Sequence, residues 1–388
     1  MNDEFDDTTD RWSSDSVKWG VYEPDVLPLW VADMDFHSPP AVLDALTQRV
    51  AHGVFGYGKD PRQLAEVIVA RLAHFYSWQV SVSDIVFLPG VVPGLYLSCR
   101  ALTEVGERVV VQTPVYQPIR RAPLDSGRSC VEVGFIRGDD GQYTIEWDVL
   151  DQALDAAAKL FILCNPQNPL GRVFSRGELE RIAEHCLRRD VVICSDEIHC
   201  DLVFPGHQHV PIASLSPEVA QRSITLMAPS KTYNLAGLDC SFAVIPNPEL
   251  RALFQKSRKG LVPRVNILGL TAALAAYQDG QGWLDEILAY LTANRDALVD
   301  QVRDQLPGVR VTAPEGTYLA WLDCRQSPAA EHPYQFFLTR AKVALSDGQT
   351  FGHGGEGHVR LNFGCRRAVL QEALARMKRA LEKAEELR

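Results

Sequence analysis

Between residues 60 and 250, short apolar runs rich in β-branched residues alternate with stretches of helical period. The strand-like runs stop abruptly at proline, glycine or a polar residue and cover residues 84–88, 108–112, 160–164, 191–194 and 224–228. The helix-like stretches between them cover residues 62–76, 93–104 and 175–189, the last opened by the capping-box pair Ser175 and Glu178. This alternation predicts an α/β protein built on a mostly parallel sheet that is covered on both faces.

The pattern changes on either side of that region. Helices are expected at residues 39–52, 266–277 and 283–302, strands at 309–312, 318–322 and 358–362, and a final amphipathic helix at 367–387. The chain is therefore expected to divide into an N-terminal arm that joins the small domain (1–48), a large sheet domain (49–285) and a smaller α+β domain (286–388).

Composition narrows the class of protein. A length of 388 residues is sufficient for two domains. The net charge of -10 argues against nucleic acid and anionic membranes as main partners. No apolar run reaches a membrane span of about 20 residues, and the acidic start Met1–Asp10 is unlike a signal or transit peptide. Nine scattered cysteines without a CxxC pair fit a reducing cytoplasm, and the histidines show no metal-ligand spacing, so no metal site is expected.

Distinctive residues follow the predicted strands. Gly90-Val91-Val92 follows the first strand, and Tyr116, Asn168, Asp196 and Lys231 follow later ones. Because ligands of parallel α/β sheets bind outside the carboxyl ends of the strands, we expect these residues to meet in one site. A lysine at the end of a buried strand has a lowered pKa and can form a Schiff base with the aldehyde of pyridoxal phosphate (PLP).

Each residue has a physical role in such a site. Asp196 is expected to keep the pyridine nitrogen protonated, Asn168 to donate to the phenolic oxygen, and Tyr116 to stack on the ring. The N–H groups of Val91 and Val92 and the Ser230 hydroxyl are expected to hold the phosphate. Taken singly, each residue also has an ordinary explanation: an exposed lysine, a helix cap, a turn residue or core packing. Their joint occurrence at successive strand ends favours the cofactor site.

Three segments carry a family resemblance: Asn165–Gly171 (NPQNPLG), Ser195–His199 (SDEIH) and Ser230–Gly237 (SKTYNLAG). With Leu27–Phe36 (LPLWVADMDF) and Val359–Gly364 (VRLNFG), they resemble fold-type I PLP enzymes of the aminotransferase class I/II group, in particular the MalY/PatB-type cystathionine β-lyases. The resemblance implies a large, mostly parallel, seven-stranded PLP-binding domain beside the smaller α+β domain.

The resemblance also implies residue roles. Arg360 matches the arginine that grips the substrate α-carboxylate, and Ala32 and Asp33 match the substrate entrance. Tyr57 matches a tyrosine that one subunit of a homodimer lends to the partner's cofactor phosphate, and it is grouped with Lys231 and Asp196 as catalytic.

Two positions depart from the aminotransferase pattern. His199 stands beside the cofactor where those enzymes usually have tyrosine, and Asp239 stands where they have a phosphate-binding arginine. Both departures fit the lyase subgroup. They leave the cationic partner of the phosphate unassigned, and Asp239 is expected to point away from it.

The predicted activity is PLP-dependent β-elimination, which cleaves cystathionine or another cysteine S-conjugate to pyruvate, ammonia and a thiol. One alternative is an aminotransferase, or a specialised secondary-metabolite PLP enzyme acting on another amino acid. An alternative of another class is a regulatory protein-binding module built on a PLP-enzyme fold.

Overall fold

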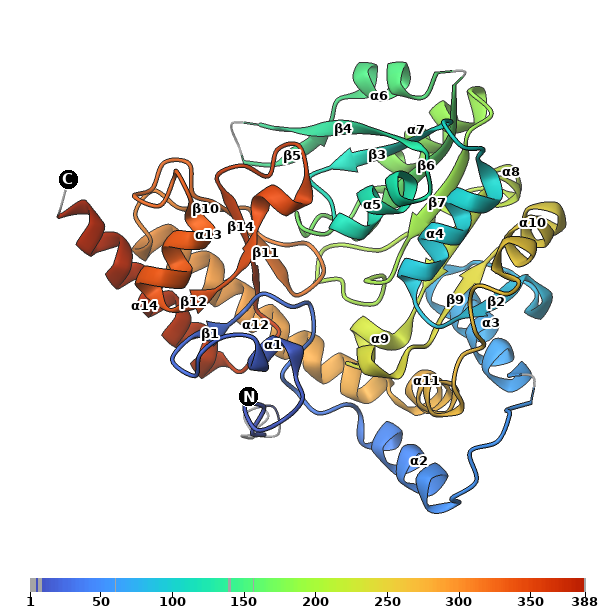
Figure 1. Cartoon of the computed structure of the whole chain (residues 1–388), viewed down its shortest axis with the longest axis horizontal. Coiled ribbons are helices and arrows are strands. Elements are labelled where there is room, and N and C mark those ends of the chain that lie inside the picture. The colour runs from blue at the N-terminus through green and yellow to red at the C-terminus, as the bar shows by residue number, and fades with distance from the viewer. Residues whose placement is uncertain (1–4, 6–8, 60, 139–140, 156, 387–388) are drawn as a thin grey trace.

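The computed structural model describes residues 5, 9–59, 61–138, 141–155 and 157–386. In this part of the chain, eight strands form a large sheet in the order β2-β9-β8-β7-β6-β3-β4-β5 (Figure 1). They are β2 (Ile85–Leu88), β3 (Arg108–Thr113), β4 (Ser129–Arg137), β5 (Tyr143–Ile145), β6 (Ala158–Cys164), β7 (Val192–Asp196), β8 (Ser223–Met227) and β9 (Ser241–Val244). The fold is the α/β fold expected, with one strand more than the seven that the resemblance implied.

Strand direction brings the site together. Neighbouring strands pair in parallel from β8 through β7, β6 and β3 to β4. Strand β9 runs antiparallel to both β8 and β2, and β5 runs antiparallel to β4. Strands β2, β3, β6, β7 and β8 therefore all end at the same edge of the sheet.

The alternating side chains of the large sheet divide its core into two layers. Val109 and Val111 of β3 pack on one side with α4, α5 and α10, whereas Val110 packs on the other with α6 and α7. Helices α3 and α11 cover that second side where β8 and β9 lie. The bounds of these helices are α3 (Arg62–Tyr76), α4 (Val91–Leu102), α5 (Gln117–Asp125), α6 (Trp147–Ala153), α7 (Arg176–Arg188), α8 (Pro217–Gln221), α10 (Pro248–Arg258) and α11 (Ile267–Asp279). Ser175 and Glu178 form the predicted capping box of α7.

A second, antiparallel sheet has the order β10-β11-β14-β13. Its strands are β10 (Arg310–Val311), β11 (Leu319–Asp323), β13 (Ser346–Asp347) and β14 (His358–Asn362). The N-terminal arm joins this part of the molecule because β1 (Leu27–Pro28) pairs in parallel with β12 (Val343–Ala344). The remaining helices are α1 (Val17–Gly20), α2 (Pro40–Ala51), α9 (Pro229–Thr232), α12 (Gln281–Gln305), α13 (Pro333–Phe336) and α14 (Arg367–Glu385).

The domain bounds 1–48, 49–285 and 286–388 stay a proposal. Both of the internal boundaries fall within continuous helices, the first in α2 and the second in α12, which extends from the large domain into the small one (Figure 1). Residues 1–4 and 6–8 of the arm and residues 387–388 of the last segment lie outside the described residues.

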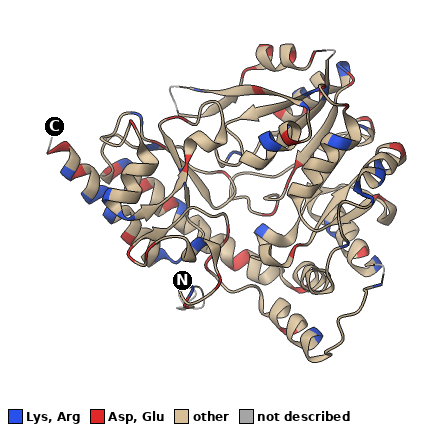
Figure 2. Ribbon diagram, viewed as in Figure 1, with Lys and Arg blue, Asp and Glu red and all other residues tan. Residues whose placement is uncertain are grey.

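Basic and acidic residues are interspersed over both parts of the molecule (Figure 2). Among the described helices, none is long and apolar enough to cross a membrane. The described residues also contain no group of three or more His, Cys, Asp or Glu side chains that could hold a metal ion.

Candidate active site

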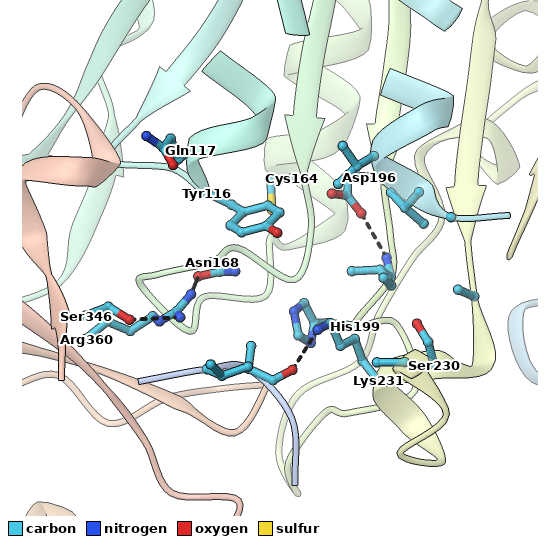
Figure 3. A pocket seen from close by; sticks show the side chains of 18 of the residues that line it. Tyr116, Gln117, Cys164, Asn168, Asp196, His199, Ser230, Lys231, Ser346 and Arg360 are labelled. Atoms are coloured by element: carbon cyan, nitrogen blue, oxygen red, sulfur yellow. Dashed lines mark hydrogen bonds between the residues drawn. The ribbon is translucent and has the colours of Figure 1, made fainter. Parts of the chain in front are cut away.

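A cavity of about 920 Å³ opens where the carboxyl edge of the large sheet faces the small domain. Its wall includes every residue that the sequence placed at a strand end, namely Val91, Val92, Tyr116, Asn168, Asp196 and Lys231. Figure 3 shows the last four of these. His199, Ser230 and Arg360 also line the cavity. These residues are far apart in the sequence, and the parallel arrangement of the strands brings them together.

Lys231 lies on α9, the short helix that follows β8. Its Nζ donates to the main-chain oxygen of Ala32 over 2.6 Å. Burial, followed by the nearby Arg360 guanidinium, lowers the pKa of Lys231 to about 8. About a tenth of the amine is then neutral at pH 7, far more than for a lysine in water. The side chain is therefore prepared to act as a nucleophile.

This pKa predicts how the cofactor-free protein takes up PLP. Because only the neutral amine attacks an aldehyde, the rate of covalent uptake is expected to rise with pH through about 8 and to level off above it. An unperturbed lysine would keep rising toward pH 10.5. Stopped-flow absorbance at a series of pH values measures the rate. A rate that shows no bend near pH 8 contradicts the prediction.

Asp196 ends β7 and is buried, with one side-chain oxygen accepting the Ile198 N–H over 3.2 Å. No Lys, Arg or His of the described chain forms an ion pair with it. Burial consequently raises the pKa of Asp196 to about 7. A buried carboxyl group without an ion-pair partner is matched by a ligand that brings a protonated ring nitrogen.

His199 and Asn168 lie in the same wall. His199 is buried, its Nδ1 has no hydrogen-bond partner among the described residues, and burial holds its pKa well below the usual value. The imidazole is therefore neutral. The Asn168 side-chain oxygen accepts from Arg360 over 2.9 Å, and its main-chain oxygen accepts from the Tyr116 N–H over 3.0 Å. The Asn168 NH₂ group is then the part left to donate to a ligand.

Arg360 projects from β14 of the small domain. Besides Asn168, its guanidinium donates to the main-chain oxygen of Trp30 over 2.8 Å and to Ser346 Oγ over 3.0 Å. The group lies 5.1 Å from the centre of the Phe351 ring, and its Nε has no partner among the described residues. Burial lowers its pKa to about 10, so it keeps its charge at neutral pH. Arg360 is thus a fixed cation with a buried N–H available to a carboxylate.

The segment 30–36 contacts both Lys231, through Ala32, and Arg360, through Trp30. Asn362 donates to the main-chain oxygens of Val31 and Asp33 over 2.5 and 2.7 Å, which holds the segment against β14. Ala32 lies on the cavity wall as expected. Asp33 is not among the lining residues, and its carboxylate pairs with Arg11 at 3.1 Å and with buried Lys18 at 3.5 Å. The nearby Asp33 carboxylate nevertheless acts on the pKa of Lys231, and its place at the substrate entrance stays a prediction.

The proposed phosphate end of the cavity is the start of α4. Val91 and Val92 open this helix after Gly90, and no side chain caps its free N–H groups. Ser230 lies on the same wall, and the exposed Asp239 also contributes atoms to it. Tyr57 is fully exposed on the loop before α3 and is absent from the wall of its own cavity.

Several residues of the cavity wall were not predicted from the sequence. Trp30 stands within a segment of the family resemblance but had no assigned role, and Ser346, Phe351 and Tyr334 carry no motif at all. These residues are brought in by the small domain and the arm. The spacing of residues within the sheet domain does not predict them.

The residues present fit PLP. The Lys231 amine suits the aldehyde of PLP, and the buried Asp196 carboxyl group suits the ring nitrogen. The Asn168 NH₂ group suits the phenolic oxygen, and the uncapped start of α4 suits the phosphate.

The family model described as "Aminotransferase class I and II" matches residues 24–377. The chain belongs to this family. It is 41% identical to the cystathionine beta-lyase PatB of Bacillus subtilis, over 97% of this chain and 99% of that protein. The structure of a protein named OvoB matches with a TM-score of 0.93 and 47% identity, covering 97% of this chain and 98% of that one.

Cystalysin of Treponema denticola, whose structure contains PLP, matches with a TM-score of 0.93 and 31% identity over 98% of both chains. The chain is thus a fold-type I enzyme similar to C–S lyases, and its cofactor is PLP.

Proposed function

We propose that the protein is a carbon–sulfur β-lyase that converts cystathionine or another cysteine S-conjugate to pyruvate, ammonia and a thiol. The observation that carries the proposal is the pairing of a partly neutral Lys231 with a fixed Arg360 cation in one cavity. The similarity to cystathionine beta-lyase PatB and to the C–S lyase of Staphylococcus hominis supports the same reaction class.

The side chains have distinct tasks in this reaction. The Arg360 guanidinium binds the α-carboxylate and so sets the direction of the Cα–H bond. The Lys231 amine removes that proton, and a thiolate leaves from Cβ. PLP, when bound, supplies the electron sink for this step, and Asp196 holds a negative charge beside its ring nitrogen. Water then completes the conversion to pyruvate and ammonia.

The test is to incubate the holoenzyme with S-alkyl-cysteines and with cystathionine in the absence of any keto acid. We expect pyruvate and thiol to appear in equal amounts over many turnovers, because elimination needs no amino acceptor. Lactate dehydrogenase coupling measures pyruvate, and a thiol reagent measures the second product. Product formation that requires an added keto acid would instead identify an aminotransferase.

We also propose a homodimer in which Tyr57 serves the partner's cavity. Val50 near the end of α2 and Val54, Phe55 and Tyr57 on the loop after it are all exposed. An apolar surface of this kind is typical of a protein interface.

Mixing two variants tests the shared site. In a shared site, one subunit supplies Lys231 and the other supplies Tyr57. A dimer of one Tyr57→Ala subunit and one Lys231→Ala subunit therefore keeps one intact site. After refolding from an equal mixture, we expect roughly a quarter of wild-type activity, from the statistics of a twofold dimer. Tyr57→Phe is the matched control. A mixture no more active than the average of the two variants contradicts the shared site.

A further inference from the structure

We propose that the cavity contains a subsite for a flat ring on the sulfur of the substrate, formed by Tyr22, Trp30 and Tyr334. This set is called the aromatic wall below. The inference rests on the proposed lyase function and deepens it by naming a class of S-conjugate. All three side chains line the cavity that holds Lys231 and Arg360.

The aromatic wall is held by contacts of its own. The rings of Tyr22 and Trp30 meet edge to face, with centroids 5.9 Å apart. The hydroxyl groups of Tyr22 and Tyr334 lie 3.3 Å apart, and the Trp30 indole N–H donates to the main-chain oxygen of Lys18 over 3.1 Å. The polar atoms of the rings are thus engaged with the protein, which leaves their apolar surfaces to face a ligand.

The aromatic wall begins at the carboxylate anchor. Arg360 donates to the main-chain oxygen of Trp30, and the Trp30 side chain leads on to Tyr22 and Tyr334. A substrate whose α-carboxylate is fixed at Arg360 has its Cα and Cβ within the same small volume. The group beyond the sulfur therefore has three rings within reach, and offset or edge-to-face contacts favour a planar aromatic group there.

The charged residues around the cavity disfavour an unpaired negative charge beside the aromatic wall. Among the described wall residues, the only Lys and Arg side chains are Lys231 and Arg360, which are both committed to the reaction. The charged side chain beside Ser346 is Asp347, a carboxylate. The distal end of cystathionine is a zwitterion, and although its ammonium could approach Asp347, its carboxylate would meet no cation among the described wall residues. Desolvating an unpaired charge is costly. We therefore expect a neutral or cationic ring to be preferred over the flexible amino-acid tail of cystathionine.

The experiment compares kcat/KM of the holoenzyme for four substrates: S-methyl-, S-benzyl- and S-cyclohexylmethyl-L-cysteine, and cystathionine. S-cyclohexylmethyl-cysteine is the matched control, because it has nearly the size of the benzyl conjugate without a flat ring. We expect S-benzyl-cysteine to exceed it by on the order of 10-fold, given the strength of aromatic pairs, and to exceed cystathionine as well. Equal values for the two ring conjugates, or a preference for cystathionine, would overturn the inference.

Variants separate the aromatic wall from a general effect on the enzyme. Tyr334→Leu is expected to lower the ratio of kcat/KM for S-benzyl- over S-cyclohexylmethyl-cysteine several-fold, whereas Tyr334→Phe is expected to keep it, since the ring remains. Tyr22→Leu provides a second variant if the first fails to fold. An unchanged ratio in both leucine variants contradicts the inference. If no S-conjugate yields pyruvate, the lyase function itself fails, whereas turnover without ring preference removes only the subsite.

Discussion

Replacing Lys231 with alanine is expected to reduce turnover by on the order of 10³-fold or more, because both the cofactor's covalent anchor and the base for the Cα proton are lost. Lys231 is the only lysine among the described wall residues, and its pKa of about 8 leaves part of the amine neutral near pH 7. The measurement is kcat/KM for the best S-conjugate, with borohydride trapping of the cofactor followed by peptide mass analysis.

The matched control is Lys256→Ala, which removes an exposed lysine on α10 and is expected to keep activity and cofactor trapping. Thermal unfolding of both variants shows whether the fold persists. Removing a buried amine that has lost part of its charge is not expected to destabilise the protein. Wild-type turnover in the Lys231 variant, or a trapped adduct at another residue, would show that the base is misassigned.

Asp196→Asn is expected to lower kcat/KM by on the order of 10²- to 10³-fold, because removing the partner of a buried charge is strongly unfavourable. Asparagine keeps the shape of the side chain and can still accept the Ile198 N–H. The loss is then electrostatic rather than structural. The affinity for PLP, measured by absorbance titration, is expected to fall along with the rate.

The exposed Asp148 on α6 provides the control Asp148→Asn, for which no change is expected. If Asp196→Asn turns over like the wild type, the carboxylate does not act on the ring nitrogen. In that event, the raised pKa of about 7 would reflect burial alone and carry no functional meaning.

The alternating pattern predicted the sheet well where strands are buried on both faces. Residues 108–112, 160–164 and 224–228 were expected as strands, and β3, β6 and β8 occupy these places. The partly exposed β4 and the short β9 were not predicted. Strand β4 lies near the edge of the sheet and is partly exposed, with Glu132 and Gly134 interrupting its apolar residues, and β9 has four residues only. Neither strand therefore carries a long apolar run.

The residues at the strand ends were predictable for a physical reason. A parallel sheet sends the carboxyl ends of its strands to one edge, so Asn168, Asp196 and Lys231 could be expected to meet without any knowledge of the loops. The wall residues contributed by the arm and the small domain follow no such rule. The pairing of Arg360 with Trp30 joins positions 330 apart in the chain.

By itself, the sequence therefore determined the sheet, its functional edge and the family, because periodicity and motifs are local properties. The tertiary structure alone decided that Asp33 pairs with Arg11 and Lys18, and that the main-chain oxygens of Trp30 and Ala32 accept from Arg360 and Lys231. It also decided that Tyr22, Trp30 and Tyr334 line the cavity. These features depend on how two domains and an arm pack together. Such long-range contacts leave no periodic trace in the chain.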